Sequence, residues 1–139
     1  MKKTNSMIFI MLIFLFQSCL FGAGLVEREI TDDYWLFANN EMHEMSIWHH
    51  SENRSGGELI VEETVFAIGY NDNFIIAKSH PKNSTNQLNK NITQFHIIQI
   101  NKSSDYNHKR LTKDEFKTIG EAIGVPNDLG FTIIYKELE

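Results

Sequence analysis

Short apolar runs, separated by polar segments rich in Asn, Ser and Gly, are the most regular feature of the chain and predict β-strands. The first run is Tyr34–Ala38, and the second extends from Met42 to His49. Asn39, Asn40 and Glu41 lie between them, and such a short polar connection is typical of an antiparallel hairpin. We therefore expect these two runs to pair.

The strongest β pattern lies in the middle of the chain. In the second half of Ile60–Tyr70 consecutive positions are apolar, so both faces of the strand would be apolar. This pattern predicts a strand covered on both faces. Residues 71–73 favour a turn, so Phe74–Lys78 should return antiparallel to it. Ser79–Asn91 is polar and predicts a long surface loop, after which Phe95–Ile100 predicts another strand.

One helix is marked at both ends. Thr112 and Glu115 have the spacing of a capping box, and Gly124 has the properties of a left-handed residue after the last turn. Between them the apolar residues recur at helical spacing and give one apolar face, formed by Phe116, Ile119 and Ile123. A last strand is predicted over Phe131–Tyr135. The expected fold class is α+β: a single antiparallel sheet with one C-terminal helix packed on one face and a final strand.

The N-terminus has the parts of an export signal. Lys2 and Lys3 precede an apolar run over residues 7–16, which is short for a transmembrane helix, and Ser18 and Cys19 follow. The segment resembles the bacterial lipoprotein signal, in which the cysteine is acylated and becomes the mature N-terminus. We thus predict a signal peptide at 1–18, a lipidated tether at 19–30 and a single α+β domain at 31–139.

Two alternatives to this processing stay open. Phe16 stands where the lipoprotein signal usually has leucine, so an ordinary secretory peptide cut after Gly24, or an uncleaved N-terminal anchor, is also consistent with the segment. Cys19 is the only cysteine, so no internal disulfide can form, and acylation with fatty acids such as palmitate would protect its thiol. Two or more acyl chains would hold the protein at a membrane.

The charge of the chain disfavours nucleic acid as a partner. The formal charge is −5, and loss of residues 1–18 removes two lysines and no acidic residue, which lowers it to −7. Phosphate backbones require a basic surface. No catalytic set is evident either: Glu62 and Glu63 are neighbours whose side chains would point to opposite faces of a strand, and no nucleophile motif is present. We expect no cofactor and a non-enzymatic role.

Three weaker hypotheses concern individual side chains. Trp35 and Trp48 could stack across the first hairpin and pack in the core. If they are exposed, we expect them, together with His80, at a surface for a partner, because aromatic anchors dominate interface energetics. The alternative is a small-ligand or metal-binding protein that uses His43, His49 and His50, although their spacing matches no common zinc motif. A hydrolase would require a pocket that brings together residues such as His96, Glu63 or Lys78.

The order of these segments also resembles a known family. Tyr34–Ala38, Val65–Pro81 and Phe95–Ile98, followed by the late helix, are similar to a family of small bacterial lipoproteins of unknown function. The resemblance implies export and attachment to a cell-envelope membrane, and it implies no activity. We therefore expect a lipid-anchored envelope protein that binds another envelope protein.

Overall fold

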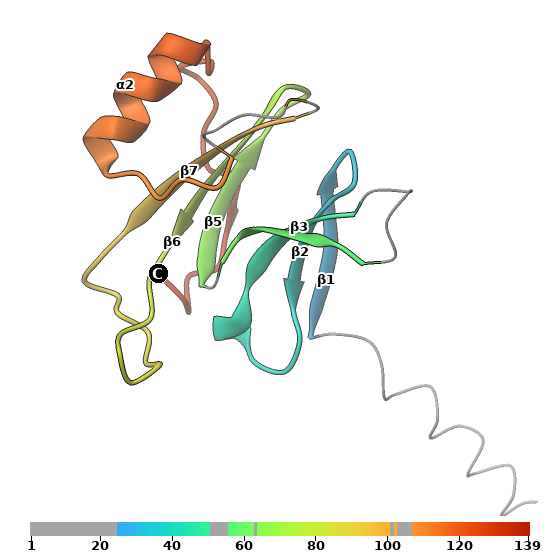
Figure 1. Ribbon diagram of the computed structural model, residues 1–139, viewed down its shortest axis with the longest axis vertical. Helices are drawn as coiled ribbons and strands as arrows, with labels where there is room; N and C mark the ends of the chain where they lie inside the picture. The colour runs from blue at the N-terminus through green and yellow to red at the C-terminus, as the bar shows by residue number, and fades with distance from the viewer. Residues whose placement is uncertain (1–24, 51–55, 63, 101, 103–106) are drawn as a thin grey trace, which may run out of the picture.

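The computed structural model describes residues 25–50, 56–62, 64–100, 102 and 107–139 (Figure 1). Within these ranges the elements are β1 (Val26–Thr31), β2 (Tyr34–Ala38), the 3-10 helix η1 (Met42–Glu44), β3 (Ser46–His49), β4 (Glu58–Val61), β5 (Val65–Tyr70), β6 (Phe74–Ser79), β7 (Gln94–Gln99), α2 (Lys113–Ile123) and β8 (Ile133–Ile134). The described strands form two four-stranded antiparallel sheets, in the orders β1-β2-β3-β4 and β7-β6-β5-β8.

The predicted α+β class is confirmed, but the prediction of a single sheet is wrong. The apolar stretch expected as one strand over Ile60–Tyr70 is divided between the sheets, since β4 ends at Val61 and β5 begins at Val65. Thr64 is fully buried in the connection, where its backbone exchanges two hydrogen bonds, of 3.0 and 2.9 Å, with the backbone of His80. This pairing turns the chain out of the first sheet and into the second.

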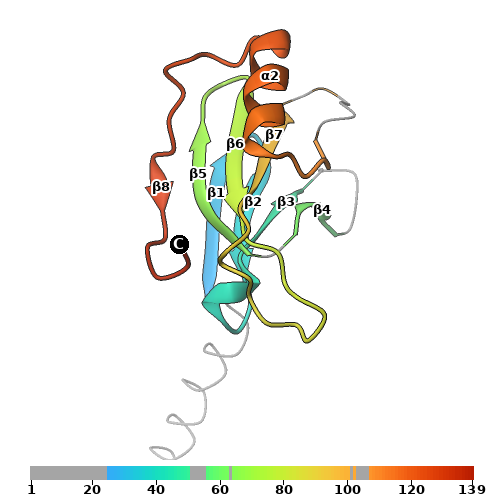
Figure 2. The same ribbon diagram turned by 90° about the vertical axis from the view of Figure 1, so that its left-hand side faces the viewer.

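The two sheets and the helix make three layers. Buried side chains of both sheets, among them Leu36, Ile47 and Ile68, form one apolar cluster between the sheets. The other face of the second sheet carries Ile76 and Ile97, which pack against the apolar face of α2. Figure 1 shows the first sheet and α2 on opposite sides of β5, β6 and β7, and Figure 2 shows the same layers turned by 90°.

The helix begins and ends where the sequence predicts. The Thr112 side chain accepts a hydrogen bond from the backbone N–H of Glu115, whose carboxylate accepts from the Thr112 backbone, and this completes the capping box. Gly124 follows the last turn with a φ of 83°, a left-handed conformation that glycine adopts without a steric penalty. No described helix is long and apolar enough to cross a bilayer.

The C-terminal part of the predicted tether is a strand. Strand β1 includes residues 26–30 of the segment predicted as a tether at 19–30, and it pairs antiparallel with β2. Ile30 is buried, whereas Glu27, Arg28 and Glu29 are exposed on this edge strand. Cys19 and the predicted signal peptide at 1–18 lie outside the described residues.

Two predicted strands are shorter than expected. The Met42–His49 run starts with η1, so its β-structure is limited to β3, and the last strand keeps only Ile133 and Ile134. The polar segment Ser79–Asn91 is mostly loop, with one antiparallel bridge between Lys82 and Leu88.

Candidate functional site

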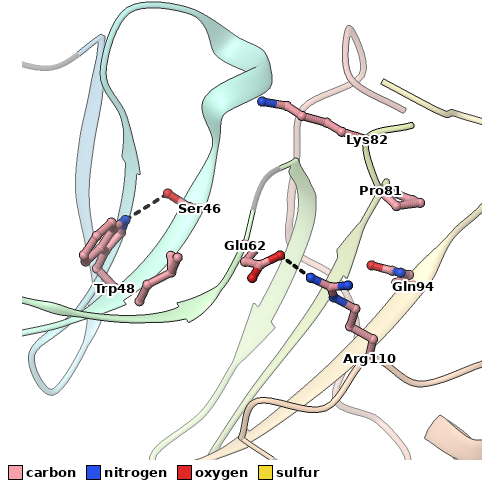
Figure 3. A pocket seen from close by; sticks show the side chains of 8 residues that line it. Ser46, Trp48, Glu62, Pro81, Lys82, Gln94 and Arg110 are labelled. Atoms are coloured by element: carbon pink, nitrogen blue, oxygen red, sulfur yellow. Dashed lines mark hydrogen bonds and ion pairs between the residues drawn. The ribbon is translucent and has the colours of Figure 1, made fainter. Parts of the chain in front are cut away.

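A pocket of about 360 Å³ opens between the two sheets, near the edge strand β4 of the first sheet and the edge strand β7 of the second (Figure 3). Its lining comes from both sheets and from the segments between them: Ser46, Trp48, Leu59, Glu62, Pro81, Lys82, Gln94 and Arg110. Trp48 and Leu59 thus share one concave surface with acidic, basic and amide groups, so a ligand could make apolar and polar contacts at the same place.

An ion pair between Glu62 and Arg110 crosses this region. Arg110 is positioned by its neighbour Leu111, whose backbone exchanges hydrogen bonds of 2.9 and 2.8 Å with Phe95 at the start of β7. The His108 side chain lies beside Glu58, with 3.7 Å between Nε2 and Oε1. The segment before α2 is therefore hydrogen-bonded to β7 through its backbone, and two of its side chains contact the β4 side.

The indole of Trp48 is fixed in the pocket wall. Its Nε1 donates to the Ser46 hydroxyl at 2.9 Å, and that hydroxyl donates to the carbonyl oxygen of Phe37 at 3.2 Å. In the register of the first sheet, Trp48 lies opposite Trp35 on one side and opposite Leu59 on the other. We call Trp35, Trp48 and Leu59 the aromatic strip.

The aromatic strip is accessible. Leu59 is 39% exposed, and both tryptophans are half-buried. Because Trp48 and Leu59 also line the pocket, the strip continues from the surface of the first sheet into the pocket. The predicted pairing of the two runs in the first hairpin is confirmed, and its register places Trp35 opposite Trp48.

A neighbouring cavity of about 380 Å³ shares Glu62 and Arg110 with the pocket and reaches His96 on β7. The His96 Nε2 lies 2.8 Å from the Ser79 hydroxyl, and both residues are at most 3% exposed. Burial lowers the pKa of His96 to about 4; a hydrogen bond to the Lys109 backbone raises it, and the positive charge of Arg110 lowers it further. The imidazole is thus neutral at pH 7, and the buried Ser79 does not line the pocket or this cavity.

The residues suggested for a hydrolase are not brought together. Lys78 lies opposite Phe95, whereas His96 lies opposite Ala77, so Lys78 and His96 project from opposite faces of the second sheet. They also line different cavities. Glu63, the third residue of that hypothesis, lies outside the described residues.

The three histidines suggested for a metal site have separate surroundings. His43 contacts Glu41, with 3.0 Å between Nδ1 and Oε2. His49 stacks on the ring of Tyr34 at 4.5 Å, and His50 meets Trp35 edge-on at 6.1 Å. In the described ranges, no group of three or more His, Cys, Asp or Glu side chains is arranged to hold a metal ion.

His80 does not belong to a surface for a partner. It is only 3% exposed, and its ring stacks on Phe66 with 4.3 Å between the centroids. Its backbone pairing with Thr64 places it at the junction of the sheets, which the sequence does not reveal.

Sequence reasoning also missed most of the polar lining of the pocket. Glu62 and Arg110 are 48 positions apart in the chain, so no local motif connects them. Gln94 comes next to a predicted strand, but its neighbours carry no signal for a binding site. The one available signal was the polar interruption at Glu62, Glu63 and Thr64 within an apolar stretch.

One comparison with known proteins gives a match. A family model described as "Protein of unknown function (DUF3997)" matches residues 31–137, which is most of the chain and includes every residue that lines the pocket. No curated protein and no solved structure matches.

Proposed function

The chain belongs to the DUF3997 family of proteins of unknown function, and we propose that it is a non-enzymatic binding module that a lipid on Cys19 holds at a bacterial cell-envelope membrane. The aromatic strip and the adjoining pocket bind another envelope protein. The observation that carries this proposal is the continuity of Trp35, Trp48 and Leu59 with a pocket that contains Arg110.

The residue types of this surface support a protein partner. Tryptophan and arginine are enriched among the residues that contribute most to binding energy. The Trp48 indole N–H already donates to Ser46, so a partner can cover this ring without leaving a buried donor unpaired. Glu62 and Arg110 add opposite charges at the same place, which favours a partner with complementary charges.

The anchor is supported by the arrangement of the N-terminus. Lys2, Lys3, the apolar run and Cys19 have the order of a lipoprotein signal. Strand β1 begins at Val26, so the chain from Cys19 to the domain reaches at most about 25 Å when extended. The domain is then held close to the membrane surface, where its partner would be another envelope protein.

Affinity capture with matched variants tests the binding surface. The full-length chain, purified in detergent, is used to capture proteins from an envelope extract, beside Trp48→Ala and Ile134→Ala variants. Ile134 is the control, because it is 47% exposed and lies on β8, the edge strand of the second sheet opposite to β7. We expect one protein to be enriched by the parent chain and the control, and about tenfold less by Trp48→Ala.

Two outcomes would contradict the binding proposal. One is the absence of any reproducibly enriched protein. The other is equal enrichment by the parent chain and Trp48→Ala, with both proteins folded by circular dichroism.

The anchor is tested by metabolic labelling. Labelled palmitate should be incorporated into the parent chain but not into Cys19→Ser, and globomycin should leave the precursor uncleaved. Mass spectrometry of the mature N-terminus should give a diacylglyceryl cysteine at position 19. An unmodified N-terminus that begins after Gly24 would instead favour ordinary secretion.

A further inference from the structure

A second concave region lies on the helix side of the second sheet, and three lysines contribute to its lining. This cavity, of about 570 Å³, is lined in part by Lys78, His80, Lys90, Thr112, Lys113 and Glu139. It shares no residue with the pocket beside the aromatic strip. It is therefore a separate candidate site, and what it binds does not depend on the function proposed above.

His80 brings an unpaired nitrogen to this region. The His80 Nδ1 lies 2.8 Å from the carbonyl oxygen of Ile92, and because a carbonyl can only accept, Nδ1 carries the hydrogen. In the neutral ring Nε2 is then an acceptor. Among the described residues this buried Nε2 has no hydrogen-bond partner, although His80 is only 3% exposed. Buried polar atoms are almost always paired, so a bound group that donates a hydrogen bond is expected here.

Three lysines supply positive charge around the same cavity. The Lys78 ammonium lies 4.5 Å from the ring centroid of Phe131, which places it beside the second sheet. Lys90 donates to the backbone oxygens of Glu137 and Glu139, and Lys113 is the first residue of α2. One acidic side chain, that of Glu139, lines the cavity, so the lysines outnumber it.

The hydroxyl of Thr112 does not count as a free ligand. It accepts from the backbone N–H of Glu115 and donates to the Glu115 carboxylate at 2.8 Å, so it belongs to the helix cap. What the cavity offers a ligand is thus positive charge from the lysines together with one buried acceptor from His80.

We propose that this cavity binds a phosphate monoester or hydrogen phosphate. The anionic oxygens would face the lysines, and the P–OH group, which persists near neutral pH because the second pKa of phosphate esters is about 6, would donate to the Nε2 of His80. Sulfate and phosphodiesters carry charge but no such proton. The same chemistry is present in a soluble phosphate ester and in the headgroup of phosphatidic acid.

Side-chain NMR of the full-length chain, labelled with ¹⁵N-histidine and purified in detergent, tests the proposal. Titration with inorganic phosphate at pH 6.5 should shift the His80 ring signals in a saturable way. Sulfate should bind at least about tenfold more weakly, a difference that corresponds to the hydrogen bond it cannot donate. Absence of a saturable shift with phosphate, or equal binding of sulfate, would overturn the proposal.

Variants separate the site from nonspecific attraction to the protein surface. Lys78→Met should weaken phosphate binding by about tenfold, because it removes one of the charges that line the cavity. Lys117→Gln removes the same charge from an exposed position on α2 outside this cavity and should change nothing. Equal losses in Lys78→Met and Lys117→Gln would show that the attraction is only to the overall charge, and the site would be rejected.

A last pair of measurements identifies the source of the phosphate group. Glycerol 3-phosphate that competes with inorganic phosphate supports a soluble ligand. Vesicles containing phosphatidic acid that bind the chain, when phosphatidylcholine vesicles do not, support a lipid headgroup. If glycerol 3-phosphate does not compete, phosphatidic acid vesicles do not bind and the His80 signals do not shift, the proposal of a phosphate monoester is wrong. None of these results depends on Trp48, so they are distinct from the capture experiment.

Discussion

The hydroxyl of Ser79 and the Nε2 of His96 lie 2.8 Å apart between β6 and β7, where water has almost no access to either side chain. A charged imidazole at this place would lose most of its hydration, and burial is the main reason why the pKa of His96 falls to about 4. The histidine is therefore held neutral inside the domain, and its protonation opposes folding.

The stability of the protein should fall as the pH falls from about 6.5 to about 4. In this range the unfolded chain binds a proton at His96, with a pKa near 6.5, while the folded chain with its pKa of about 4 does not. The contribution of His96 to the free energy of unfolding is fully present above pH 6.5, and its loss should reach roughly 3 kcal/mol below pH 4. Urea unfolding at a series of pH values measures it.

A pair of variants assigns this pH dependence to one residue. His96→Gln should be less stable at pH 7 but should have a smaller pH slope between 6.5 and 4, whereas Ile134→Ala, at an exposed site, removes no titratable group and should keep the slope of the parent chain. An unchanged slope in His96→Gln would show that other groups cause the acid sensitivity.

The elements with strong local signals could be predicted from the sequence. Those that depend on contacts between residues far apart in the chain could not. The capping box of Thr112 and the pairing of Trp35 with Trp48 depend on spacing within a few residues or on a short hairpin, and both are present. Strand β1 was missed because Glu27, Arg28 and Glu29 are consecutive charged residues, which protect a sheet edge but give no apolar pattern.

The second sheet and the pocket were missed for a related reason. A polar interruption at residues 62–64 separates β4 from β5, and periodicity alone does not show whether a chain continues in the same sheet after such a break. The Glu62 and Arg110 side chains meet only after both sheets and the segment before α2 are in place. The pocket is thus a product of the tertiary structure.

Gly69→Ala should strongly destabilise the protein. A Cβ at this position would lie 2.0 Å from the backbone oxygen of Gly130, and a backbone atom cannot move aside without shifting its segment. We expect a loss of about 2–3 kcal/mol in the free energy of unfolding. Gly130→Ala is the matched control, because a Cβ there meets nothing within 4 Å. Equal stability of the two variants in urea unfolding would contradict this close approach.

Thr112→Ala should lower stability by about 1 kcal/mol, because the first turn of α2 loses its cap. Hydrogen bonds from the backbone and the side chain of Thr112 keep the pKa of Glu115 low, and this pKa should also rise because the substitution removes the hydroxyl donor. Thr118→Ala, at an exposed position inside the helix, should be neutral or slightly stabilising because alanine has the higher helix propensity. Thermal unfolding compares the two, and a similar loss in both would argue against the cap.

Arg110→Gln should change the electrostatics of the site much more than the stability of the fold. The Arg110 and Glu62 side chains are 53% and 65% exposed, so their ion pair should contribute only about 0–1 kcal/mol. Leu36→Ala in the core, by comparison, should cost about 2–5 kcal/mol. The charge of Arg110 also helps to keep the pKa of His96 low, so Arg110→Gln should raise that pKa while burial still holds it below 6.5. NMR titration of His96 reads this directly, and a pKa that stays the same or falls in Arg110→Gln would mean that the guanidinium does not act on the buried imidazole.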